Sequence, residues 1–170
     1  NMSHIPNYSA SGDTITASCS QCSQENIGTI VISASGKTYD GTAVVATVEN
    51  NVDTTDYSSL IVYKDNDGDV VDEAVNAGTY TANLTVGGVI AKVEFTIAPK
   101  SITVTADNAS KTYGEDEPTF TYTATGLEGS DTLTGTLSRE TGENAGTYAI
   151  TQGTLANPNY EITFVEGTFT

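Results

Sequence analysis

Two cysteines and the only histidine of the chain are the residues best suited to holding a metal. Cys19 and Cys22 form a Cys-x-x-Cys pair, and His4 precedes them in the same N-terminal segment. Such a pair is one half of a zinc ribbon, which needs four thiolate or imidazole ligands. No second pair occurs in this sequence, so a disulfide or two free thiols are the alternatives to a metal site. A redox role is not expected, because no βαβ pattern follows the pair.

Three aspartates at alternate positions, Asp65, Asp67 and Asp69, suggest a calcium loop. In an EF-hand loop counted from Asp65, the sixth place is a glycine and the twelfth is a glutamate. These places hold Val70 and Asn76 in this chain. The simpler interpretation is the exposed tip of a hairpin, because Asp67-Gly68 lies between two short apolar runs.

The acidic run Glu115-Asp116-Glu117 is interpreted in the same way, as an exposed loop rather than a metal site. Paired carboxylates also serve glycoside hydrolysis, but those of this chain fall in predicted turns. No serine lies in a Gly-x-Ser-x-Gly turn, and neither cysteine has an evident base. The sequence therefore predicts no catalytic residue, no cofactor-binding residue and no metal ligand, and we expect no enzyme.

The composition limits the possible partners. The 170-residue chain has 22 acidic and 6 basic residues, a formal net charge of -16, so we expect neither nucleic-acid nor membrane-surface binding. It has no apolar run of the roughly 18 residues that cross a membrane, and its N-terminus has no signal pattern. We therefore interpret it as an internal piece of a longer chain. Its abundant threonine and valine favour strands over helices.

A pentapeptide occurs twice and divides the chain. Asn76-Ala77-Gly78-Thr79-Tyr80 returns at residues 144–148, each time after a Lys-Thr-Tyr and before a Phe-Thr. These flanking motifs lie at 37–39 and 111–113, and at 95–96 and 169–170. We infer two tandem copies of one domain, at residues 27–98 and 99–170, after an N-terminal stub or linker at residues 1–26.

The pentapeptide has a structural interpretation of its own. Glycine before a strand permits a positive φ, and the tyrosine two places later can lay its ring on the core. Its hydroxyl can then bond a nearby backbone group, as in the tyrosine corner of immunoglobulin-like sandwiches. An ordinary loop before an edge strand is the alternative.

Short strands separated by turns run through both copies, without a convincing helix. We predict all-β architecture: two small antiparallel immunoglobulin-like β-sandwiches and a short β hairpin in the stub. A β-grasp-like unit with one short helix at residues 126–133 is the alternative. Ala98-Pro99-Lys100 is too short and stiff for a free hinge, so we expect the copies to stack end to end as a short rod. The expected strands are Asn7–Ala10, Asp13–Ser18, Thr29–Ala34, Ala43–Val48, Leu60–Lys64, Asp69–Asp72, Tyr80–Val86, Ala91–Ile97, Ile102–Ala106, Thr119–Thr125, Leu133–Ser138, Thr147–Gln152, Tyr160–Phe164 and Gly167–Thr170.

The second copy combines four motifs: Lys-Thr-Tyr-Gly at 111–114, Gly-Leu-x-x-x-Asp-Thr-Leu at 126–133, Asn-Ala-Gly-Thr-Tyr at 144–148 and Asn-Pro-Asn-Tyr at 157–160. In this combination it resembles the YGX-type MBG repeats of bacterial surface proteins. The first copy, with Lys-Thr-Tyr-Asp-Gly at 37–41, is similar to the YDG version, although its middle departs from the pattern. The resemblance implies a non-enzymatic stalk or adhesin region at the bacterial cell surface.

Several expectations follow from the resemblance. The partners would be neighbouring repeats, in a monomeric chain without membrane insertion. The alternatives are a module that binds a glycan or host protein through Tyr57, Tyr63 or Tyr122, and accessory domains of a larger surface enzyme. Related surface proteins carry Lys-to-Asn isopeptide bonds, for which Lys92 is the best candidate. An outward-facing lysine that protects a sheet edge is the alternative.

Overall fold

The computed structural model describes residues 5–19 and 26–170, and the chain divides into two β units. The first contains Asn1–Thr38 and Thr42–Ala98, and the second contains Tyr39–Gly41 and Pro99–Thr170. Among the described residues the one helical element is a single 3-10 turn, η1 (Ser58–Leu60). No helix in this part of the chain has the length and apolar character needed to cross a membrane.

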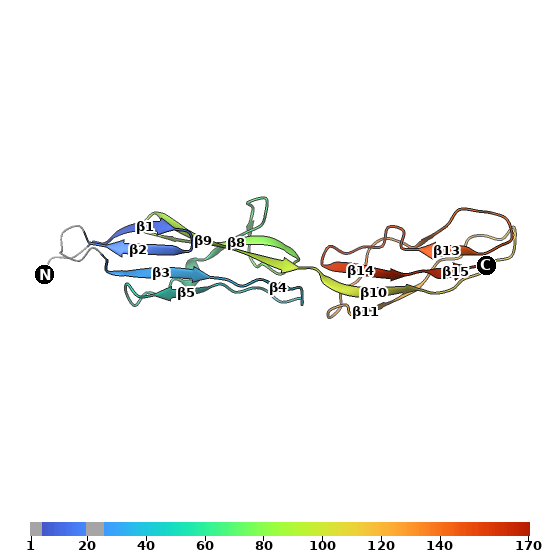
Figure 1. Cartoon of the computed structure of the whole chain (residues 1–170), viewed down its shortest axis with the longest axis horizontal. Helices are drawn as coiled ribbons and strands as arrows, with labels where there is room; N and C mark the ends of the chain where they lie inside the picture. Colours follow the sequence, from blue (N-terminus) through green and yellow to red (C-terminus); the bar gives the residue numbers. More distant parts are fainter. Residues whose placement is uncertain (1–4, 20–25) are drawn as a thin grey trace. The chain divides into compact units, whose positions relative to one another are not determined.

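The first unit is built from two facing sheets (Figure 1). One has the order β1-β2-β3-β5, and all its neighbours are antiparallel. The other has the order β4-β9-β8-β6-β7. The strands are β1 (Asn7–Ser11), β2 (Thr14–Ser18), β3 (Gly28–Ser33), β4 (Lys37–Thr38), β5 (Thr47–Asn50), β6 (Val62–Lys64), β7 (Val70–Val71), β8 (Gly78–Val86) and β9 (Val89–Ala98).

Alternation along the strands fills the core between these sheets. Every second residue of β8 from Tyr80 to Val86 is buried, as period-two apolar patterning requires. The other sheet contributes four fully buried side chains, Ile15, Ala17, Ile30 and Ile32. The first unit is therefore sandwich-like, as the sequence predicts.

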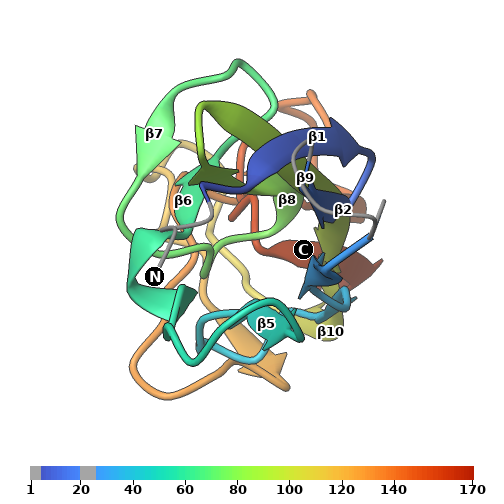
Figure 2. The same ribbon diagram turned by 90° about the vertical axis from the view of Figure 1, so that its left-hand side faces the viewer.

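The N-terminal hairpin belongs to this sandwich, whereas the sequence suggested a separate stub at residues 1–26. The predicted pairing of β1 with β2 is confirmed, but β2 also pairs with β3. The Gly12 carbonyl accepts a hydrogen bond of 2.8 Å from the Lys92 amide, and the hairpin lies against β9 (Figure 2). The physical reason is the pair Ile15 and Ala17, which are fully buried and need a facing sheet.

The second unit has two three-stranded sheets, in the orders β11-β10-β14 and β12-β13-β15. Its buried side chains include Ile102, Val104, Leu137, Ile150 and Leu155. The strands are β10 (Lys100–Ala106), β11 (Tyr122–Thr125), β12 (Ser138–Arg139), β13 (Tyr148–Thr151), β14 (Tyr160–Val165) and β15 (Gly167–Phe169).

A parallel ladder joins the beginning and the end of this unit, although the sequence suggested antiparallel sheets. Strands β10 and β14 pair in parallel from Lys100 with Tyr160 to Thr105 with Val165 (Figure 1). The same register continues beyond them, where Ala109 forms a parallel bridge with Phe169. We call these pairs the terminal ladder. Parallel pairing is possible because a long crossover, residues 107–159, separates the two strands.

Two further expectations differ from the structure. The segment predicted as a helical turn is a simple turn, in which the Asp131 amide donates to the Glu128 carbonyl at 2.9 Å. The β-grasp alternative therefore has no helix to support it. The strands expected at 43–48 and 133–138 are mostly irregular, and only bridges at Val44 and Thr134 precede the short β5 and β12.

Candidate functional site

The two pentapeptide tyrosines make the same hydrogen bond. The Tyr80 hydroxyl donates to the Asn76 carbonyl at 2.9 Å, and Tyr148 donates to the Asn144 carbonyl at 2.8 Å. This confirms the interpretation as a tyrosine corner. The expected positive φ is not general, because Gly146 lacks one and Gly78 is nearly extended at 157°.

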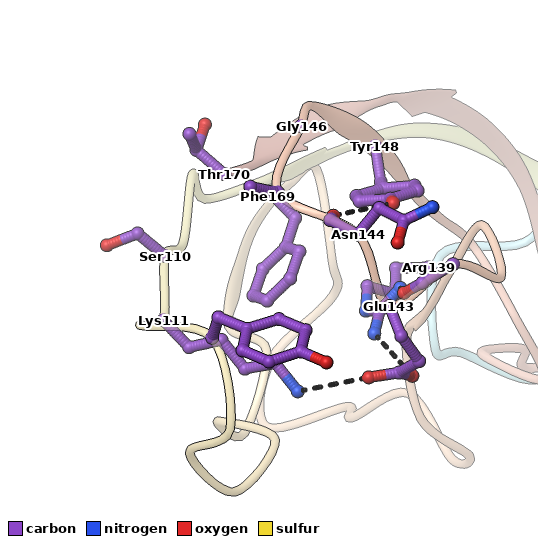
Figure 3. A pocket seen from close by; sticks show the side chains of 12 residues that line it. Ser110, Lys111, Arg139, Glu143, Asn144, Gly146, Tyr148, Phe169 and Thr170 are labelled. Atoms are coloured by element: carbon purple, nitrogen blue, oxygen red, sulfur yellow. Dashed lines mark hydrogen bonds and ion pairs between the residues drawn. The ribbon is translucent and has the colours of Figure 1, made fainter.

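A cavity of about 370 Å³ lies beside the second of these tyrosines (Figure 3). Its walls combine three aromatic rings, from Tyr113, Tyr148 and Phe169, with the charged side chains of Lys111, Arg139 and Glu143. We call it the Tyr113 pocket. Tyr113 is its most distinctive residue, because 78% of this large side chain is exposed.

Arg139 is the central charged residue of the pocket wall. Its guanidinium carbon lies 5.2 Å from the ring centre of Tyr148 and 4.8 Å from that of Phe169, within cation–π range. It forms a two-point ion pair with Glu117 and donates to the carbonyls of Glu140 and Gly142 at 2.7 and 2.9 Å. These internal bonds occupy most of the guanidinium N–H groups. Arg139 therefore stabilises the fold and has few N–H groups left to bind a ligand.

The sequence suggested that Glu117 lies in a solvated acidic loop. The structure instead places its carboxylate in ion pairs. Besides Arg139 it pairs with Lys111 at 2.9 Å. The hydrogen bond from Arg139, followed by that from Lys111, lowers the pKa of Glu117 to about 2. Its neighbour Glu115 accepts a hydrogen bond from the Thr112 amide, which closes the loop on itself.

A second cluster of the same unit centres on Asp131. One carboxylate oxygen accepts hydrogen bonds from the hydroxyls of Tyr160 at 2.6 Å and Tyr39 at 2.8 Å. The Glu128 amide donates to the Tyr160 hydroxyl at 2.8 Å, and the two tyrosine rings meet edge to face at 5.4 Å. Burial, reinforced by the bond to Asp131, raises the pKa of Tyr160 to about 12. We call this cluster the Asp131 site.

The residues considered for metal binding have other roles where the structure describes them. Cys19 is buried and disulfide-bonded, so its sulfur is not a zinc thiolate. Cys22 and His4 lie outside the described residues. The Asp65 carboxylate accepts hydrogen bonds from the amides of Asp67 and Asp69, which organises the predicted hairpin tip between β6 and β7. Within residues 5–19 and 26–170 no three potential metal ligands gather.

None of the three tyrosines considered for ligand binding is fully exposed. Tyr57 is buried, and its hydroxyl donates to Asp53 at 3.0 Å. Tyr63 is half-buried and accepts a hydrogen bond from the Ala46 amide, and Tyr122 is half-buried in β11. Lys92, considered for an isopeptide bond, is exposed on β9, whereas that reaction needs a buried lysine.

The sequence did not single out Arg139, and it identified Tyr113 and Phe169 only as members of the repeated motifs. Arg139 is the only arginine of the chain. In a protein with so many carboxylates, a lone arginine is a signal that could have been noticed. Its position between two rings depends on pairings distant in sequence, Tyr148 with Phe169 and Arg139 with Ile150, which no local pattern specifies.

Comparison with known proteins concerns residues 102–170, which contain the Tyr113 pocket and, apart from Tyr39, the Asp131 site. No curated protein shows significant similarity to the chain. The family model of the MBG domain (YGX type), however, matches residues 102–170. This range contains Tyr113, Asp131, Arg139 and Tyr148. Residues 102–170 of this chain are therefore similar to an MBG domain of the YGX type.

Proposed function

We propose that the chain is a non-catalytic repeat segment of a bacterial extracellular surface protein, where it acts as a load-bearing spacer and in adhesion. The MBG domain supports a repeat module, and the matching tyrosine bonds of both units support a duplicated design. In each unit this tyrosine also pairs across the sheet with a phenylalanine, Phe95 or Phe169. The observation that carries the proposal is the terminal ladder.

The terminal ladder has the geometry of a clamp under tension. Force on a spacer enters the second unit at Pro99 and leaves it at Thr170. Because β10 and β14 are parallel, such force pulls them past each other and loads their hydrogen bonds together rather than one at a time. Three further bonds of 3.0–3.1 Å extend the clamp between residues 109–111 and 168–170.

The chemistry of the site also favours a structural role. The strongest charged groups, Arg139 and Glu117, are engaged with each other and with the backbone. Asp131 is engaged by two tyrosine hydroxyls, which lower its pKa. Groups that are already paired have little capacity to activate a substrate, so we propose no reaction for either cluster.

Single-molecule force spectroscopy tests the spacer role. The whole chain is stretched from its ends, and the unfolding of the second unit is identified by a gain of roughly 20 nm of chain. The control molecule is held at Lys100 and Thr125, which lie at the same end of the antiparallel β10–β11 pair. This geometry opens that pair stepwise.

We expect a clearly higher unfolding force when the chain is stretched from its ends than in the control. Unfolding forces report the barrier along the direction of pulling. Equal forces in the two geometries would contradict the proposal.

A further inference from the structure

The Lys-Thr-Tyr motif ends in a tyrosine with different surroundings in its two copies. Tyr39, from the first motif, is part of the second unit and is only 5% exposed. Tyr113, from the second motif, is 78% exposed. The same sequence motif therefore contains a buried tyrosine in one copy and an exposed tyrosine in the other.

The surroundings of Tyr39 show what such a tyrosine binds. The Asp131 site offers a carboxylate oxygen to the hydroxyl at 2.8 Å and the edge of the Tyr160 ring to the aromatic face. Burial of a phenol requires a partner for its hydroxyl, and this site supplies one. The Asp131 site thus accepts a tyrosine side chain through the Asp131 carboxylate and the Tyr160 ring.

Tyr113 lies beside an apolar recess that is suited to contact with another protein surface. The Tyr113 pocket has aromatic walls from Tyr148 and Phe169, and its ionic groups are already paired. An exposed aromatic ring beside an apolar recess is typical of an interaction surface. Lys111, Tyr148 and Phe169 of the pocket wall belong to the repeated motifs, and their counterparts in the first copy are Lys37, Tyr80 and Phe95.

We propose that Tyr113 and the Tyr113 pocket form the docking surface for another MBG unit. The Tyr113 hydroxyl donates to the carboxylate that corresponds to Asp131 in that unit, and its ring meets the tyrosine that corresponds to Tyr160. The inference rests on the repeat role proposed above. Because the chain carries a net charge of -16, a hydrogen bond and a ring contact suit two such acidic units better than ion pairing does.

A chain extended by one more unit tests this docking. After Thr170 it carries Ile-Ala, the residues that follow Thr96 in the first copy, and then a repeat of residues 99–170 in which the tyrosine corresponding to Tyr113 is replaced by phenylalanine, so that the Tyr113 peptide is unique. Covalent linkage gives the docking surfaces a high effective concentration. Tetranitromethane nitrates exposed tyrosines, and peptide mass spectrometry gives the rate for each.

In the present chain we expect rapid nitration of Tyr113 and slow nitration of Tyr39. In the extended chain the rate at Tyr113 should fall at least about tenfold, toward that of Tyr39, because a buried ring reacts only through local opening. Replacing Asp131→Ala in the added unit alone should restore rapid nitration. Asp116→Ala in that unit is the matched control, since it removes the same charge from an exposed loop, and it should leave Tyr113 protected.

Nitration of Tyr113 at the same rate in the present and extended chains would overturn the proposal. Protection that survives Asp131→Ala in a folded added unit would overturn it as well. Both results would leave the unfolding force of the second unit unaffected, so they are distinguishable from a failure of the spacer role.

Discussion

The most informative single residues are tyrosines whose hydroxyls stabilise backbone turns. Tyr80 is 8% exposed, stacks on Phe95 at 5.7 Å between ring centres and bonds the Asn76 carbonyl. Tyr148 repeats the hydrogen bond in the second unit. A phenol in this position ties a loop to the strand that follows it, which phenylalanine cannot do.

We predict that Tyr80→Phe lowers the free energy of unfolding of the first unit by about 1 kcal/mol, the usual net value of one hydrogen bond. Urea denaturation checks this value. Tyr113→Phe serves as the control, because 78% of that side chain is exposed, and it should change stability little. A Tyr80→Phe variant as stable as the parent chain would show that the bond is dispensable.

Glu117 makes stability depend on pH. Its pKa is about 2 in the folded chain because of Arg139 and Lys111, below the ordinary value of 4.5. The contribution of its ionised form is therefore complete above about pH 4.5 and is lost as the pH falls toward 2. We predict that Glu117→Gln is less stable than the parent at pH 7 and that the difference shrinks across this window. Urea midpoints at several pH values measure it, and a constant difference would contradict the assignment.

At the scale of elements, the hairpin between β8 and β9 is sharply specified. Gly87 and Gly88 have φ of 57° and 82°, the two positive values of a type I′ turn that matches the strand twist. The sequence predicts this turn directly, since two glycines separate alternating strands. The surroundings of the two glycines nevertheless differ, which only the structure reveals.

We predict that Gly87→Ala destabilises the first unit more than Gly88→Ala does. A methyl group on Gly87 would lie 2.1 Å from the Tyr8 ring, whereas one on Gly88 meets open space. Gly88→Ala should cost roughly 1–2 kcal/mol, the penalty of the left-handed conformation alone. Thermal unfolding ranks the two variants, and Tyr8→Ala combined with Gly87→Ala should recover part of the loss. Equal effects of the two alanines would contradict the contact with Tyr8.

Strands with period-two patterning are the part of the fold that the sequence predicts well. The segments that form β2, β8, β9 and β10 alternate apolar and polar residues. Glycine also lies at each end of β8. The segments at 43–48 and 133–138 were predicted as strands and are largely irregular. Both segments contain residues that favour strands. Each nevertheless forms only one bridging pair with another segment, at Val44 and at Thr134.

The candidate site was predictable only in part. The tyrosine corner followed from the repeated pentapeptide, because glycine and tyrosine have specific conformational roles. The Arg139 network did not follow, because it joins residues from 111 to 169 by tertiary packing. The acidic run was interpreted as solvated, since nothing in its own sequence shows that the one arginine of the chain reaches Glu117.

At the scale of the whole molecule, the two units have separate cores, and the repeat predicts this division. The first core includes the N-terminal hairpin, which the sequence placed outside the domain. The hairpin has no counterpart in the second copy, so comparison of the copies could not assign it to a sheet. We infer that β1 and β2 widen the first sandwich beyond the duplicated part.

The central claim is that the terminal ladder bears load, and a pair of variants tests it most directly. Ala109→Pro removes the amide that donates to the Thr168 carbonyl at 3.0 Å inside the ladder. Tyr148→Phe removes a hydrogen bond of 2.8 Å outside it. Both variants should lower the free energy of unfolding of the second unit in urea.

The decisive measurement is the unfolding force of the second unit, with the chain stretched from its ends. We predict that Ala109→Pro lowers this force markedly, because it interrupts the pairs that are loaded together. Tyr148→Phe should leave the force close to that of the parent chain. If the force instead follows urea stability in both variants, the ladder is not the load-bearing element.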